Sequence, residues 1–124
     1  MTKTVVTILG VVFIAIGLLG FVNNPILGIF GVNMLHNIVH IVSGALALWA
    51  VNKGMDATVL FSKVFGVVYG VVAVLGFVLP ALMMDLLAVD MADNILHVVL
   101  AVVFLYIGFG SNQSSNSAPA ASAL

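Results

Sequence analysis

The sequence contains no cysteine, no arginine and no glutamate, and only 6% of its 124 residues are charged. The absence of cysteine excludes disulfides, thiolate metal ligands and cysteine nucleophiles. Three lysines and four aspartates are the only charged residues, so the chain has no basic patch and we expect no nucleic-acid partner. Any chemistry must come from histidine, aspartate, asparagine, serine and tyrosine.

Hydrophobic residues make up 64% of the chain, and its charged fraction is far below the roughly one-quarter typical of a soluble domain. Four apolar runs are long enough to cross ~30 Å of hydrocarbon at a rise of ~1.5 Å per residue. They cover residues 4–22, 34–51, 57–79 and 92–109. The sequence therefore predicts an all-α membrane protein with four transmembrane helices, surrounded by a lipid bilayer.

An internal repeat relates the two halves of the chain. The matching pairs are residues 10–22 with 66–78, which share Gly-Val-Val and Leu-Gly-Phe-Val, and residues 32–42 with 89–99, which share Asn-Ile-x-His. We predict two tandem two-helix repeats, at about residues 4–53 and 57–110. Each repeat crosses the membrane twice, so both insert in the same orientation and are related by a pseudo-two-fold axis along the membrane normal.

The lysines indicate how the chain is oriented. Lys3, Lys53 and Lys63 precede the first span or flank the connection between the second and third. The positive-inside rule places these segments, and both termini, in the cytoplasm. Residues 1–110 then form a single transmembrane domain, and residues 111–124, rich in serine, asparagine and alanine, form a disordered cytoplasmic tail.

The two connectors on the opposite side contain Pro25 and Pro80. Proline suits the first turn of a helix, where its missing N–H costs nothing, and we expect both prolines in such turns. The apolar stretches that follow, residues 26–32 and 81–89, are too short to span the bilayer. We expect them to lie in the interface or to dip in beside the bundle.

Polar residues recur at helical spacing on one face of the second span and one face of the fourth. They are Asn33, His36, Asn37 and His40 in the first case, and Asp90, Asp93, Asn94 and His97 in the second. Because unpartnered polar groups are costly in hydrocarbon, both faces should point into the bundle and towards each other. His40 and His97 hold equivalent positions in the two repeats.

One interpretation of these faces is structural. Asparagine and histidine join membrane helices through hydrogen bonds worth about 0.5–2 kcal/mol each. In this interpretation Asn33, Asn37, Asp90 and Asn94 are structural polar residues. His40 and His97 are neutral, each donating from one ring nitrogen to a carbonyl or to an asparagine of the partner span, and the residues do no chemistry.

A second interpretation is a ligand site. His36 and His40 are four residues apart, as are Asp93 and His97, so each pair can bind one cation from a single helix face. The ligands of zinc, iron or manganese are then His36, His40, Asp93 and His97. For haem or another tetrapyrrole, His40 and His97 are the axial ligands. Proton or ion movement is a further alternative, and the sequence favours no one cofactor.

Gly66 and Gly70 form a small-residue face on the third span. Such a face lets another helix approach closely. We expect it to serve packing within the bundle, and contact with a second copy or with another subunit of a membrane complex is the alternative.

Three segments together resemble a family of small four-span bacterial membrane proteins catalogued as a domain of unknown function. They are Leu-Gly-Ile-Phe at residues 27–30, His-Asn-Ile-Val-His at 36–40 and Ala-Asp-Asn-x-x-His at 92–97. The resemblance implies a four-span fold and a bacterial inner-membrane location, and it implies no activity. Since no motif pairs a nucleophile with a base, we expect a structural or accessory subunit that is not an enzyme, with metal or tetrapyrrole binding as the alternative.

The orientation is testable with topology reporters. Reporters fused after Gly54 and at the C-terminus should both read cytoplasmic, because the lysines bias those segments inward. A C-terminus on the exoplasmic side would contradict four spans in this orientation.

Overall fold

A computed structural model describes residues 1–110, and the predicted disordered tail at 111–124 lies outside the described residues. Within residues 1–110 there are five α-helices, a final π-helical turn and no strand. The elements are α1 (Thr2–Leu19), α2 (Met34–Lys53), α3 (Met55–Val78), α4 (Pro80–Leu87), α5 (Met91–Leu105) and η1 (Tyr106–Gly110).

Four of these helices are long and apolar enough to cross a membrane, as the sequence predicts. The spans are Thr2–Leu19, Met34–Lys53, Met55–Val78 and Met91–Gly110. Their outward faces carry large apolar side chains, such as Ile8, Leu60 and Val102, each more than half exposed. Water would not tolerate so continuous an apolar surface, so the chain is a multi-pass membrane protein whose outer face contacts lipid.

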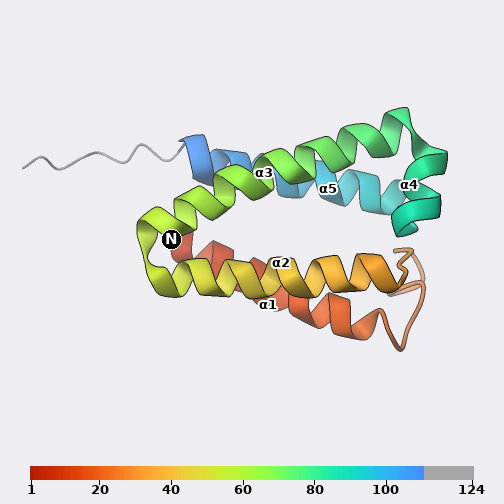
Figure 1. Cartoon of the computed structure of the whole chain (residues 1–124), viewed down its shortest axis with the longest axis horizontal. Coiled ribbons are helices and arrows are strands. Elements are labelled where there is room, and N and C mark those ends of the chain that lie inside the picture. Colours follow the sequence, from red (N-terminus) through yellow and green to blue (C-terminus); the bar gives the residue numbers. More distant parts are fainter. Residues whose placement is uncertain (111–124) are drawn as a thin grey trace, which may run out of the picture.

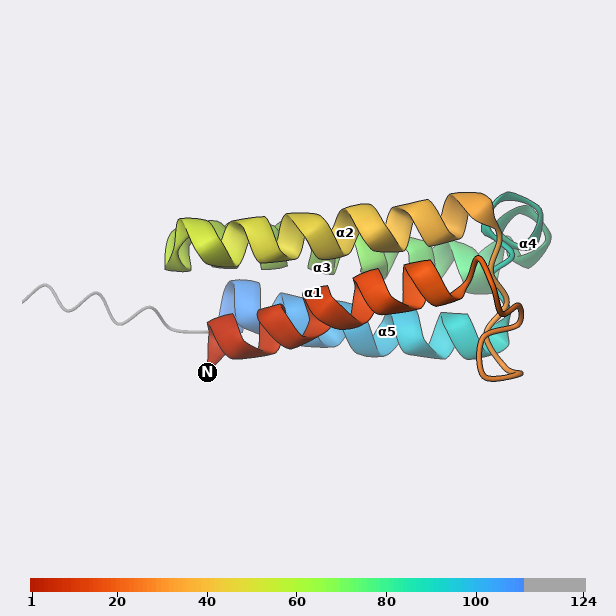
Figure 2. The same ribbon diagram turned by 90° about the horizontal axis from the view of Figure 1, so that it is seen from below.

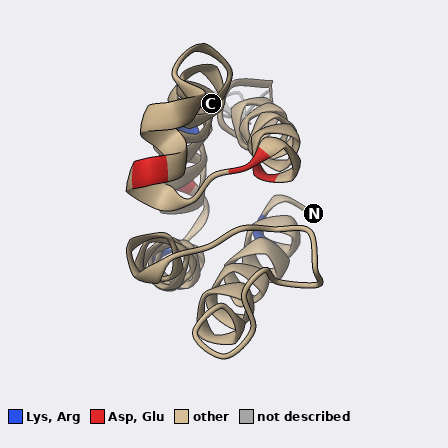
Figure 3. Cartoon of the chain, turned by 90° about the vertical axis from the view of Figure 1, so that its right-hand side faces the viewer, with Lys and Arg blue, Asp and Glu red and all other residues tan. Residues whose placement is uncertain are grey.

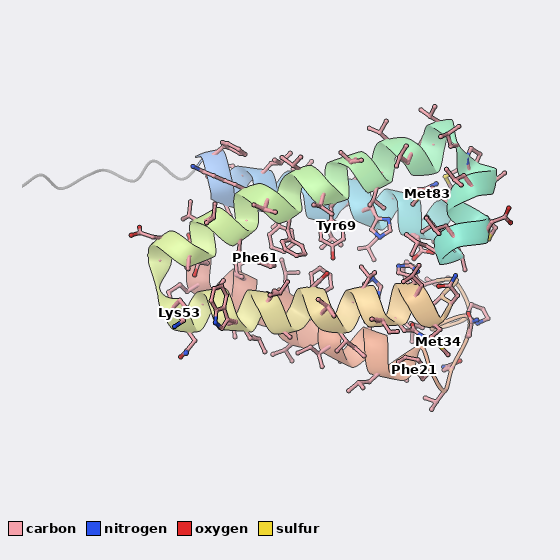
Figure 4. The ribbon with its side chains drawn as sticks, viewed as in Figure 1. Phe21, Met34, Lys53, Phe61, Tyr69 and Met83 are labelled. Carbon is pink, nitrogen blue, oxygen red and sulfur yellow. The ribbon has the colours of Figure 1, made fainter. Side chains whose placement is uncertain are left out.

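The long helices lie side by side as a bundle of two pairs (Figures 1 and 2). Helix α1 packs along α2, α3 packs along α5, and α2 also contacts α3. Short α4 lies at the end of the bundle opposite the N-terminus. That end also holds the connector between α1 and α2, so both connectors lie together (Figure 4, near Phe21, Met34 and Met83).

Most of the charged residues lie towards one end of the bundle or the other, and Figure 3 looks onto the end that carries α4. Lys3 begins α1, Lys53 ends α2 and Lys63 lies in the first half of α3, all towards the end away from α4. Asp85 lies on α4, and Asp90 and Asp93 lie at the start of α5, at the opposite end. Asp56, in the first turn of α3, shares the lysine end, so all three lysines lie towards one end and three of the four aspartates towards the other.

Glycine brings the paired helices into backbone contact. A Cβ on Gly44 of α2 would lie 2.5 Å from the carbonyl oxygen of Gly10 on α1. A Cβ on Gly66 of α3 would lie 2.8 Å from the backbone nitrogen of Leu105 on α5. Gly66 is thus used inside the chain, as expected, and it is not available to a second copy. Gly70 is different, because its nearest neighbour would be the Cβ of Ala101 at 4.0 Å.

Of the two connector prolines predicted to begin a helix, only one does so. Pro80 stands in the first turn of α4, as predicted. Pro25 does not begin a helix, and that prediction is wrong. The Asn24 side chain instead holds Val32 through both its N–H and its carbonyl, which keeps the segment between them as a loop. These side-chain hydrogen bonds satisfy backbone groups that a helix would otherwise have paired.

Gly66 and Gly70 provide a matched pair for testing helix contact. Gly66→Ala should lower stability by about 1–3 kcal/mol, because the added methyl overpacks against Leu105. Gly70→Ala should be neutral or stabilising, since the methyl has room and alanine favours helix. Unfolding of both variants in the same detergent would measure the difference, and equal stabilities would contradict the packing.

Candidate metal site

Side-chain caps set where the two polar helices begin. Asn33 Oδ1 accepts from the backbone N–H of His36 at 2.9 Å at the start of α2. Asp90 Oδ1 accepts from the N–H of Asp93 at 3.0 Å at the start of α5, and Asp93 Oδ2 accepts from the N–H of Asp90 at 3.1 Å. This reciprocal pair is a capping box, with Asp at both positions. The cap at Asn33 is followed by His36 in the first turn of α2 and by His40 one turn later. The cap at Asp90 is followed by His97 about two turns along α5.

The same caps tie the two halves of the molecule together. Asn33 Nδ2 donates to the carbonyl of Leu86 at 3.0 Å, and the N–H of Gly31 donates to Asp90 Oδ2 at 2.9 Å. Burial opposes the charge of Asp90, but the N–H groups of Asp93 and Gly31 outweigh that effect and hold the pKa of this carboxyl below its ordinary value. The starts of α2 and α5 are therefore cross-linked through the connectors.

Below these caps, three imidazoles converge from two helices. His36 and His40 of α2 have ring centroids 4.4 Å apart, and His97 of α5 lies 6.0 Å from His36. One ring nitrogen from each histidine lies within 4.8 Å of the others. The three side chains are 2%, 7% and 3% exposed, so the cluster is closed from its surroundings.

One ring nitrogen of each histidine in this cluster lacks a hydrogen-bond partner among the described residues. The Nδ1 atoms of His36, His40 and His97 are buried and have no hydrogen-bond partner within residues 1–110. The backbone carbonyls of Gly31 and Leu87 lie close enough to interact with the His36 ring. A backbone carbonyl that receives one imidazole N–H leaves the other nitrogen free to bind a metal, which is the usual arrangement around ligating histidines.

Two aromatic rings flank the cluster on its inner side. Phe13 of α1 stacks on His40 at 5.9 Å with an interplanar angle of 5°, and Tyr69 of α3 stacks on His97 at 5.7 Å. Phe13 and Tyr69 also stack on each other at 5.6 Å. Figure 4 shows Tyr69 pointing inwards from α3 towards α2. All four long helices thus contribute to the site.

A cavity of about 40 Å³ lies among the imidazoles, with Tyr69 and Ser43 also in its wall. A second cavity, of about 130 Å³, lies between α1 and α5 and reaches His40 and Asp93. The first volume suits one ion or one or two waters. A tetrapyrrole is drug-sized or larger and needs a cavity of at least about 300 Å³, so neither space matches the alternative in which His40 and His97 bind haem.

The remaining residues predicted for the site lie around the cluster and outside it. Asp93 is buried but serves the capping box, and it is not part of the group of convergent ligand atoms. Asn94 Nδ2 donates to the carbonyl of Gly76 on α3 at 3.1 Å, so it joins helices as the structural interpretation expects. Asn37 is buried with its Oδ1 unpartnered within the described residues.

The sequence analysis missed Phe13 and Tyr69. A signal was present, because the repeat aligns Phe13 with Tyr69 just as it aligns His40 with His97. An aromatic residue at equivalent positions of two inner helix faces predicts a shared contact at the centre of the bundle. Apolar stretches hide such residues, since phenylalanine is common throughout the spans.

Comparisons with known proteins assign the chain to a family but give it no activity. A family model described as "Domain of unknown function (DUF4383)" matches residues 3–110. No curated protein and no solved structure matches the chain.

The cap of α5 can be tested with two aspartates at the same end of the bundle. Asp90→Ala should lower stability by about 0.5–2 kcal/mol, because the N–H groups of Asp93 and Gly31 lose their acceptor. Asp85→Ala should change it by less than about 0.5 kcal/mol, since Asp85 is exposed on α4. Thermal or chemical unfolding measures both variants, and equal losses would argue against the cap.

Proposed function

The chain belongs to the family described as a domain of unknown function (DUF4383), and we propose that it is a membrane protein that binds one divalent transition-metal ion through His36, His40 and His97. The observation that carries this proposal is the convergence of three buried imidazoles whose Nδ1 atoms are unpartnered among the described residues. Neutral imidazole is a common ligand of zinc, iron, copper and nickel.

Energetics favour a metal over a purely structural role. A buried polar atom without a hydrogen bond costs about 1–3 kcal/mol, and the cluster contains three such nitrogens. In the proposed complex each imidazole turns its Nδ1 to the ion, so that coordination satisfies the three atoms together. A tetrahedral zinc with Zn–N bonds of ~2.1 Å brings the nitrogens about 3.4 Å apart, which small rotations of the side chains supply from the present arrangement.

The surroundings also suit a cation. Three neutral ligands leave the double positive charge of the ion in place, and Asp93 lines the neighbouring cavity that His40 also lines. Its role is electrostatic rather than coordinating in this proposal. The fourth position faces the small cavity that Tyr69 and Ser43 also line, with room for a water or a hydroxide.

Ion translocation is less well supported than binding. Between the histidines and the lysine end of the bundle, the interior is filled by apolar side chains, including Val6, Phe61, Phe104 and Ile107. Thr58 and Ser62 are buried in the same half of the bundle, but their hydroxyls donate to backbone carbonyls of their own helix end, at Gly54 and Thr58. We therefore propose that the ion is held rather than passed across, and that the protein is a metal-binding accessory protein and not an enzyme.

We also propose that the two helix pairs are tandem repeats with pseudo-two-fold symmetry along the membrane normal. Equivalent contacts support this. Asn33 and Asp90 cap equivalent helices and each binds the connector of the other half, and a Cβ on Gly20 or on Gly76 would collide with the equivalent side chains Asn37 and Asn94.

For location we propose a bacterial inner membrane with both termini in the cytoplasm. The clustering of Lys3, Lys53 and Lys63 towards one end of the bundle supports this orientation. The metal then lies nearer the exoplasmic side, below the aspartate-bearing connectors.

Metal content tests the proposal. Purified protein loaded with zinc should hold one ion per chain by elemental analysis. His36→Ala, His40→Ala and His97→Ala should each weaken zinc at least about 100-fold in competition with a chromophoric chelator, because each removes a ligand. Asp93→Asn, which keeps a cap acceptor, should weaken it less than about tenfold, and Asp85→Ala should not change it.

Two outcomes would contradict this assignment. One is the absence of stoichiometric metal in folded wild-type protein. The other is metal that survives in all three histidine variants. An intense Soret band in the purified protein would instead support the tetrapyrrole alternative. Circular dichroism and gel filtration establish that each variant is folded.

A further inference from the structure

The larger cavity lies outside the histidine cluster and is not explained by metal binding. It lies between α1 and α5 under the connector between α1 and α2, and its volume is about 130 Å³. Its walls are apolar, with Phe13 and Ile16 of α1 facing Leu96 of α5. An engineered cavity of about 150 Å³ with such walls binds benzene, so this volume corresponds to one six-membered ring.

Two polar residues interrupt the apolar wall, and both are at least nine-tenths buried. They are His40, 7% exposed, and Asp93, 3% exposed. A purely apolar filling would offer the polar groups of His40 and Asp93 no hydrogen bond in this low-dielectric part of the wall. A ligand that carries a hydroxyl would offer one, because a hydroxyl both donates and accepts.

The route into the cavity leads from the lipid. Leu19 and Leu27 lie at its rim and are 39% and 75% exposed, and α1 and α5 pack far less closely on each other than each does on its own partner. This loosely packed side would let a molecule dissolved in the bilayer enter between α1 and α5. Water-soluble charged molecules are excluded by the apolar rim.

We propose that this cavity binds a lipid-soluble phenol, with its ring between Phe13 and Leu96 and its hydroxyl on His40 and Asp93. The ring matches the cavity in size, and the hydroxyl matches the only polar part of its wall. A longer apolar tail on such a molecule would leave past Leu19 into the lipid. The site uses no bound ion, but it shares His40 with the proposed metal site, so phenol binding is measured on metal-free protein and does not depend on the metal being bound.

Phenol and toluene test the site, because they match in size and differ in the hydroxyl. Binding is measured by calorimetry on full-length protein in lipid nanodiscs after chelator treatment, with empty nanodiscs subtracted. Phenol should bind saturably at one site per chain. Toluene should bind about tenfold more weakly, since it lacks one hydrogen bond.

Variants locate the bound ring. Leu96→Trp and Ile16→Phe each fill the cavity and should weaken phenol at least about tenfold, whereas Leu60→Trp on the lipid face of α3 should not. Two filling variants are used so that one misfolded protein does not decide the result. Equal binding to wild type and to a folded filling variant, binding of toluene as tight as that of phenol, or no binding above empty nanodiscs would each overturn the proposal. Loss of zinc in the histidine variants is measured separately and does not bear on it.

Discussion

Hydrocarbon offers a polar group neither water nor any other hydrogen-bonding partner, and the fold follows from that constraint. Each long helix turns its lipid-facing side chains outwards and must satisfy its polar residues inside the bundle. Thr58 and Ser62 do so through carbonyls of neighbouring residues, and Asn94 does so across the helix pair. Six buried side-chain atoms lack such partners within the described chain: Nδ1 of His36, His40 and His97, Oδ1 of Asn37 and Asn94, and the Tyr69 hydroxyl. Among them the three imidazoles converge on one point, and that convergence identifies the site.

Packing within and between the two helix pairs brings the three histidines together. Gly44 and Gly66 allow the backbones within each pair to approach closely. The pairs then meet through Phe13 and Tyr69, which stack on each other and on the imidazoles. The connectors close the end above the site, where the caps of α2 and α5 cross-link the two halves.

Much of this was predictable from the sequence, because lipid imposes a simple pattern. Length and hydropathy locate the four spans, and helical spacing places His36, His40 and His97 on inner faces. Periodicity does not give the rotation of one helix against another, so it grouped Asp93 with the histidines, whereas in the structure Oδ2 of Asp93 accepts from the N–H of Asp90 and the convergent ligand atoms are those of the three imidazoles. The loop at Pro25 was mispredicted because the Asn24 bridge to Val32 is a contact that composition does not encode.

The central claim is that one ion is held by three imidazoles. X-ray absorption at the zinc edge, on folded protein carrying one equivalent of zinc, tests the coordination shell directly. We expect nitrogen ligands at ~2.0–2.1 Å with the multiple-scattering pattern of three imidazoles and one additional light-atom ligand. A shell made mainly of oxygen, or one that shows fewer than two imidazoles, would contradict the tri-histidine site.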